Sequence, residues 1–108
     1  METPLFTAPP AIMFIGADAD LADECAKANP VVPVLRVGHA AAGVERMLVT
    51  RPLVVVVDDS VPPDEIARVV ECARDIRASL VHASSATSEG LAAAVRDGII
   101  AASRARGA

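Results

Sequence analysis

The fold of this chain is best predicted from the segment Arg51-Pro52-Leu53-Val54-Val55-Val56-Val57-Asp58-Asp59-Ser60-Val61-Pro62. Its four consecutive valines show no alternation of apolar and polar residues, which is typical of a strand buried on both faces. Such strands lie at the centre of parallel sheets that helices cover on both sides. In open sheets of this kind, ligands bind at the carboxyl ends of the strands, where the strand order reverses. The stretch therefore predicts a central strand that brings Asp58 and Asp59 to a crevice.

The segments on both sides of this strand alternate between strand-like and helical patterns. We expect strands at 11–16, 31–37, 53–57 and 79–83, each followed by a helix, with Val44, Met47 and Leu48 facing inward from the second helix. Pro33 lacks an N–H group, so the second strand is predicted at an edge of the sheet. His82 is expected in a central strand, close to the crevice. The alternation predicts an α/β fold with a parallel sheet and right-handed crossovers.

Gly98 leaves two alternatives open for residues 99–102. The fourth helix either continues through Gly98 to about Arg104 or ends there, in which case residues 99–102 begin a fifth strand. We favour the continued helix, because no turn residues separate Gly98 from the run that follows.

Length and composition limit the possible functions. The 108 residues predict one domain, residues 11–108, after a flexible proline-containing leader, residues 1–10. A net charge of −4 and an aromatic content of 2% argue against nucleic acid as a partner. Cys25 and Cys72 show no metal-ligand spacing, and Arg104 and Arg106 are interpreted as a solvated, frayed terminus. No apolar run approaches the roughly 20 residues of a membrane span, which predicts a cytoplasmic protein without a membrane partner.

The order and spacing of these elements resemble the receiver domain of bacterial two-component response regulators, from Ile12 to about Ala102. The closest match is Arg51 to Pro62, where Asp58 lies six residues after Pro52 and Pro62 lies four residues after Asp58. The resemblance implies a flavodoxin-like open parallel sheet with strand order 2-1-3-4, its fifth strand missing or degenerate. It also implies that Asp58 is the phosphoryl acceptor and that Ser84, or Ser85 as an alternative one residue later, is the family's serine or threonine after the fourth strand.

Two other parts of the family's site are missing. The family's acidic pair after the first strand, which holds Mg²⁺, is replaced by Gly16 and Ala17, and the family's lysine after the fifth strand has no counterpart, because Lys27 is the only lysine. Phosphoryl transfer depends on charge neutralisation by a metal and a cation. We therefore expect no cofactor; Mg²⁺, held by Asp58, Asp59 or Asp18, belongs only to the phospho-accepting alternative. Asp18 is more simply explained as a helix cap.

The resemblance and its gaps together predict a non-enzymatic pseudo-receiver domain. It would act in bacterial signal transduction through protein–protein contact, independently of phosphorylation, with a sensor kinase or a second copy as partner. The candidate contact surface is formed by Leu91, Val95 and Ile99, provided that they face outward from the fourth helix. The alternatives are a phospho-accepting receiver that uses Asp58 and, more distantly, a small-ligand-binding flavodoxin-like domain. No nucleotide-binding glycine motif occurs.

Overall fold

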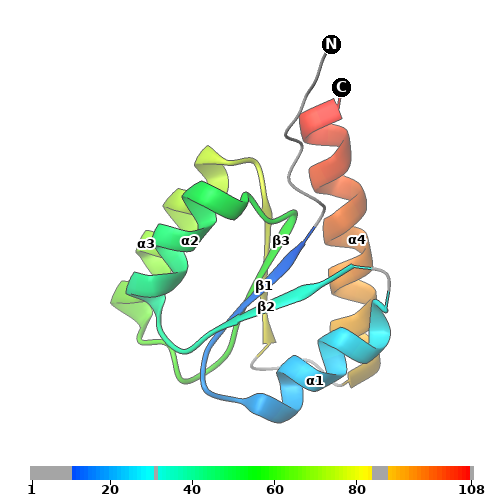
Figure 1. The fold of residues 1–108 in the computed structure, drawn as a ribbon, viewed down its shortest axis with the longest axis horizontal. Coiled ribbons are helices and arrows are strands. Elements are labelled where there is room, and N and C mark those ends of the chain that lie inside the picture. The colour runs from blue at the N-terminus through cyan, green and yellow to red at the C-terminus, as the bar shows by residue number, and fades with distance from the viewer. Residues whose placement is uncertain (1–10, 31, 84–87, 108) are drawn as a thin grey trace.

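A computed structural model describes residues 11–30, 32–83 and 88–107 of the chain, without the side chains of residues 88 and 89. The leader predicted at 1–10, Ser84 and Ser85 lie outside the described residues. Strands and helices alternate along the chain (Figure 1), in the order β1 Ile12–Ile15, α1 Ala19–Ala28, β2 Val34–Val37, α2 Ala40–Thr50, β3 Val54–Val57, α3 Pro63–Asp75, β4 Ser79–His82 and α4 Ser88–Gly107.

The four strands form one parallel sheet in the order β2-β1-β3-β4. This confirms the predicted α/β class and the flavodoxin-like strand order 2-1-3-4. β2 begins directly after Pro33 and lies at an edge, as that proline predicts. The prediction that His82 lies in a central strand is wrong, because β4 forms the opposite edge of the sheet. In the part of the chain that the structure describes, no fifth strand follows β4.

The two central strands are buried on both faces. Helices α2 and α3 cover one face of the sheet, and α1 and α4 cover the other (Figure 1). Met13, Ile15 and the alternate valines 55 and 57 pack under α2 and α3, whereas Ile12, Phe14 and valines 54 and 56 pack under α1 and α4. Because both faces of β3 lie against apolar helices, every position of that strand requires an apolar side chain, and the four valines follow.

Helix α4 runs without a break through Gly98, so residues 99–102 are helical and the favoured alternative is confirmed. Gly98 is buried against the sheet, and a Cβ built there would lie 3.1 Å from Val54 Cγ2 and 3.1 Å from Ser79 Cβ. The Ser79 hydroxyl donates a hydrogen bond of 2.8 Å to the Gly98 carbonyl. The glycine thus marks a close approach between α4 and the sheet rather than the end of a helix.

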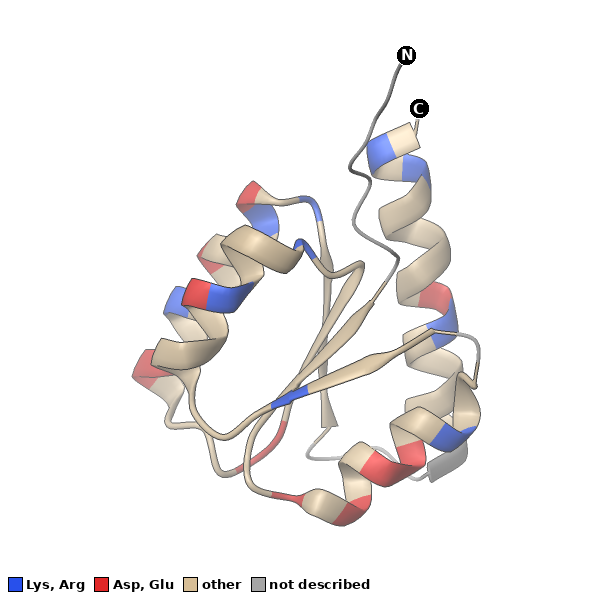
Figure 2. Ribbon diagram, in the orientation of Figure 1, with Lys and Arg blue, Asp and Glu red and all other residues tan. Residues whose placement is uncertain are grey.

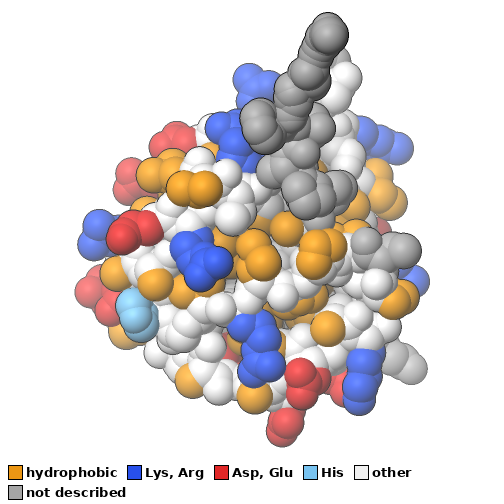
Figure 3. All heavy atoms as spheres, in the orientation of Figure 1, with side chains coloured by type: hydrophobic (Ala, Val, Ile, Leu, Met, Phe, Trp, Pro, Cys, Tyr) orange, Lys and Arg blue, Asp and Glu red, His pale blue; other side chains and the backbone are white. Residues whose placement is uncertain are grey.

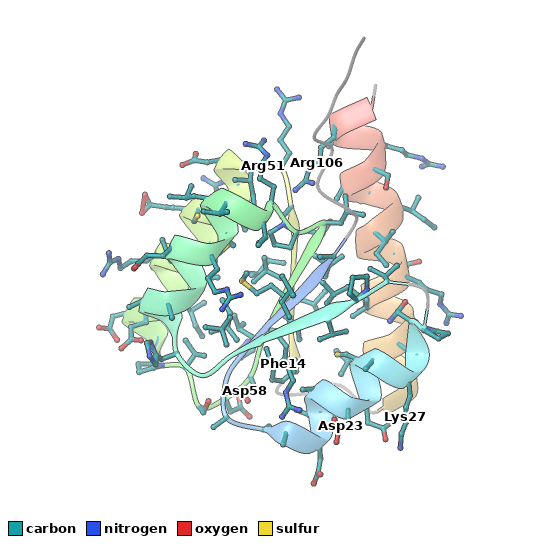
Figure 4. All side chains as sticks on the ribbon, viewed as in Figure 1. Phe14, Asp23, Lys27, Arg51, Asp58 and Arg106 are labelled. Atoms are coloured by element: carbon teal, nitrogen blue, oxygen red, sulfur yellow. The ribbon has the colours of Figure 1, made fainter. Side chains whose placement is uncertain are left out.

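Arg106 holds the end of α4 in place, which corrects the interpretation of this region as a frayed terminus. Its guanidinium donates to the carbonyl oxygens of Ile76 at 3.1 Å, Arg51 at 2.9 Å and Pro52 at 2.6 Å. These carbonyls belong to the segment after α3 and the α2–β3 connection. Burial, together with the positive charge of Arg51, lowers the pKa of Arg106. The contact therefore ties three segments together at the amino-terminal end of the strands (Figure 4).

Across the described ranges, none of the helices has the combination of length and apolar character that a bilayer crossing requires.

Candidate functional site

The predicted crevice lies where the carboxyl ends of the central strands β1 and β3 meet. A shallow depression of about 550 Å³ opens there, lined by Ala17, Asp18, Leu21, Asp58, Asp59, Ser60 and Ala83. Strand order reverses between β1 and β3, because β2 lies outside β1 and β4 lies outside β3. The depression thus occupies the switch point at which open parallel sheets bind ligands.

Asp58, the first residue after β3, lies beneath this depression and is only 2% exposed. One carboxylate oxygen, Oδ2, accepts a hydrogen bond of 2.8 Å from the backbone N–H of Asp18. The other, Oδ1, accepts from the backbone N–H of Ser60 at 2.8 Å and from the Ser60 hydroxyl. Asp58 therefore connects the β1–α1 loop to the β3–α3 loop, and both of its oxygens accept hydrogen bonds. Figure 4 shows its place among these loops.

Gly16, the residue after β1, makes room for this carboxylate. Its φ angle is +148°, a conformation that L-residues with a side chain rarely adopt. A Cβ built on Gly16 would lie 2.1 Å from Asp58 Cγ and 2.2 Å from each carboxylate oxygen. The space that a side chain at position 16 would occupy is therefore filled by Asp58 itself.

The hydrogen bonds also set the charge state of Asp58. Burial by itself raises the pKa of this carboxyl, but the hydrogen bonds from the Ser60 hydroxyl and from the backbone N–H groups of Asp18 and Ser60 outweigh burial and lower the pKa. Asp58 is consequently an anion at neutral pH. It is also a weak base, because the donors that stabilise its negative charge disfavour proton uptake.

The other two candidate carboxylates near the crevice have separate roles. Asp18 caps α1, since its Oδ1 accepts a hydrogen bond of 3.1 Å from the backbone N–H of Leu21, as the capping interpretation predicted. Asp59 is exposed, and its Oδ1 lies 3.6 Å from His82 Nε2. Asp18 and Asp58 meet through a backbone N–H group, whereas the side chain of Asp59 extends toward β4.

These residues do not suit a Mg²⁺ ion. Mg²⁺ requires several oxygen ligands in near-octahedral geometry. Gly16 offers no side-chain oxygen, Asp58 is engaged by donors, and Asp18 directs Oδ1 to its own helix. Among the side chains that the structure describes, no cluster of three or more His, Cys, Asp or Glu residues is arranged to hold a metal.

Sequence reasoning did not identify Ser60 as part of the site. Its hydroxyl donates to Asp58 and accepts a hydrogen bond of 3.0 Å from the backbone N–H of Ala17, so it bridges the same two loops. Ser60 lies two residues after Asp58. In turns, an aspartate commonly accepts a hydrogen bond from the backbone N–H of the residue two positions later, so this spacing could have revealed Ser60.

The predicted contact surface on α4 does not form. Leu91 is 1% exposed and Val95 is 0% exposed, and both belong to the core under α1 and α4. Ile99 is partly buried against the same core. These residues face the sheet instead of solvent, because α4 uses its apolar stripe to cover β3 and β4.

Comparisons with protein-family models, with curated proteins and with solved structures find no significant match.

Proposed function

We propose that this chain is a receiver-like interaction module that acts in bacterial signalling by contact with a partner protein, without phosphorylation of Asp58. The observation that carries the proposal is the engaged state of Asp58, which is buried and accepts hydrogen bonds from two loops with both oxygens. A carboxylate that attacks phosphorus must present a free oxygen to the phosphoryl donor.

The charges around Asp58 support the same proposal. A phosphoryl group in transfer needs cations to neutralise it. The only lysine of the chain, Lys27, lies in the last turn of α1, whereas Asp58 lies beside the start of that helix (Figure 4). The position after β1 offers no acid for a metal, because the side chain there would overlap Asp58. A phosphorylated Asp58 would lack both sources of positive charge.

The phospho-accepting receiver is the second candidate, and the spacing of Asp58 from Pro52 and Pro62 favours it. This function requires Asp58 to exchange its donors on Asp18 and Ser60 for a phosphoryl donor. The two candidate functions therefore differ in whether Asp58 breaks these hydrogen bonds when a phosphoryl donor is present.

Intact mass spectrometry after incubation with acetyl phosphate and Mg²⁺ separates the two. We expect the native protein to gain no phosphoryl group. Asp58→Ala and Asp59→Ala serve as a matched pair, because the two carboxylates are adjacent but only Asp58 is buried. A hydroxylamine-sensitive adduct that forms on the native protein and on Asp59→Ala, but not on Asp58→Ala, would overturn the proposal.

A further inference from the structure

A groove lies between α2 and α3. These two helices cover the face of the sheet opposite α1 and α4 (Figure 1). The groove consists of two adjoining depressions that share Val44 and Arg68. Its apolar lining comes mainly from the α2 side, and its charged lining comes from α3. None of the residues that line the groove lines the depression at Asp58.

The α2 side of the groove is apolar and open to solvent. Val44 and Leu48 are four residues apart and therefore lie one turn apart on the same helix face. Leu48 was predicted to face inward, but the prediction is wrong, since it is 61% exposed. Val49 is 80% exposed and extends the apolar surface around the helix. Among the described residues, only Ile100 on α4 is a comparable exposed large hydrophobic side chain.

The α3 side of the groove is acidic. It carries four carboxylates, on Asp64, Glu65, Glu71 and Asp75, against one guanidinium, on Arg68. Within the described part of the chain, none of these five side chains forms an ion pair within 4.0 Å. An apolar surface beside an excess of carboxylates attracts a segment that carries apolar side chains beside basic ones. Figure 2 marks the Asp and Glu positions, together with Lys and Arg positions, along α2 and α3, and Figure 3 shows charged and apolar side chains at the left of the molecule.

We propose that this groove docks an amphipathic helical segment of a partner protein, with aliphatic side chains along one face and Lys or Arg beside them. The aliphatic side chains would cover Val44 and Leu48, and the basic side chains would pair with the α3 carboxylates. Charge favours such a partner over a second copy of this chain, because two copies with a net charge of −4 repel each other. The proposal rests on the proposed function, since it supplies the interaction module with its surface.

The test is a titration of the native, isotope-labelled protein followed by amide NMR shifts. The probe is a synthetic helical peptide with leucine along one face and lysine along the other. A peptide with glutamate in place of lysine is the charge control. We expect the lysine peptide to shift amides of α2 and α3, and the glutamate peptide to shift none. The acidic residues at the start of α1 provide an internal comparison, because non-specific attraction of a cation would shift them equally.

Matched variants assign the contact to the groove. Leu48→Ser and the double variant Glu71→Lys with Asp75→Lys should each weaken binding of the lysine peptide about tenfold, because they remove an apolar contact or turn attraction into repulsion. Ile100→Ser and Asp97→Lys change side chains on α4 that are also exposed, and they should leave the affinity unchanged. Circular dichroism checks that each variant is folded.

Three results would overturn the proposal. The first is that the lysine peptide does not bind or shifts amides outside α2 and α3. The second is that the groove and α4 variants have equal effects. The third is concentration-dependent association of the protein alone, in sedimentation, that Leu48→Ser abolishes; this would identify a second copy as the occupant. An acetyl phosphate adduct on Asp58 would overturn the proposed function while leaving peptide binding to the groove intact, so the two failures are distinguishable.

Discussion

Truncation of Asp58 should destabilise the fold, and the sign of this effect decides what the residue does. In a cluster of carboxylates built to hold a metal, like charges repel one another when no metal is bound, so removing one acid relieves repulsion. In this chain, Asp58 instead accepts hydrogen bonds from Asp18 and Ser60, and its negative charge is compensated by those donors. Asp58→Ala removes the acceptor and leaves the donors behind.

The magnitude follows from the contacts. A hydrogen bond to a charged group contributes roughly 1.5–3 kcal/mol, and Asp58 accepts three of them. Their full total is not lost, because Asp18 and Ser60 lie at the exposed rim, where water can reach their N–H groups once the side chain is truncated. The variant is also relieved of the cost of burying a carboxylate. We therefore expect Asp58→Ala to lower the free energy of unfolding by about 2–4 kcal/mol.

Urea denaturation followed by circular dichroism measures this loss, with Asp59→Ala as the matched control. The control should change the free energy of unfolding by less than about 0.5 kcal/mol, because Asp59 is exposed and has only a 3.6 Å contact with His82. Asp58→Asn should also destabilise the protein. The amide NH₂ group of the asparagine must face the N–H group of either Asp18 or Ser60, and two donors cannot form a hydrogen bond with each other. A gain in stability from Asp58→Ala, or a loss no larger than that of Asp59→Ala, would refute this reasoning.

The pH dependence gives an independent check on the same contact. The hydrogen bonds lower the pKa of Asp58 in the folded protein below its value in the unfolded chain, despite burial, which acts in the opposite direction. A group with a lowered folded pKa contributes stability above its unfolded pKa, about 3.9 for aspartate, and loses this contribution as the pH falls through the folded value. The stability difference between the native protein and Asp58→Ala should therefore be constant from neutral pH to about pH 5 and shrink below about pH 4.

Three further substitutions test the packing around the site and the sheet, each by urea denaturation. Gly16→Ala should lower the free energy of unfolding by about 3 kcal/mol or more, because Gly16 has a φ of +148° and the new Cβ overlaps Asp58. The double variant with Asp58→Ala should lose less than the sum of the two single losses, because the overlap is then removed. Arg106→Ala should lower the free energy of unfolding by about 1–3 kcal/mol, because it removes three hydrogen bonds. Arg106→Lys should keep only part of this stability. Arg104→Ala, at an exposed position, should change the free energy of unfolding by less than about 0.5 kcal/mol. Gly98→Val should cost about 1–3 kcal/mol, because a Cβ there already lies 3.1 Å from its neighbours.

The fold could be predicted because the order of apolar and polar residues along the chain indicates which faces of each strand are buried. The unbroken valines of β3 indicate helices on both faces of the sheet, and Pro33 places β2 at an edge whatever its neighbours are. Gly98 was ambiguous for a physical reason. A glycine can end a helix or allow a helix to approach a sheet closely, and only the positions of Val54 and Ser79 distinguish the two.

The surface of the molecule was harder to predict than its interior. Helical periodicity identified Leu91 and Val95 as one apolar face, but the same spacing results whether that face covers a sheet or a partner. Likewise, Leu48 has the spacing of a core residue of α2, yet it lies beyond the edge that packs on the sheet. Periodicity identifies a face of a helix, and the arrangement of the layers decides what covers it.

The candidate site shows why residue spacing alone could not assign a role to Asp58. Its distance from Pro52 and Pro62 fixes its place at the end of β3, but the direction of its oxygens is set by Gly16 and Ser60. Without a side chain, Gly16 leaves the space into which the carboxylate turns, and Ser60 supplies donors to one of its oxygens. An acid placed at Gly16 would have to displace Asp58 from both loops before the two could share a metal. The absence of an acid after β1 and the buried, engaged state of Asp58 are therefore one structural feature, and no single substitution at Gly16 or Asp58 is expected to create a phosphoryl acceptor from it.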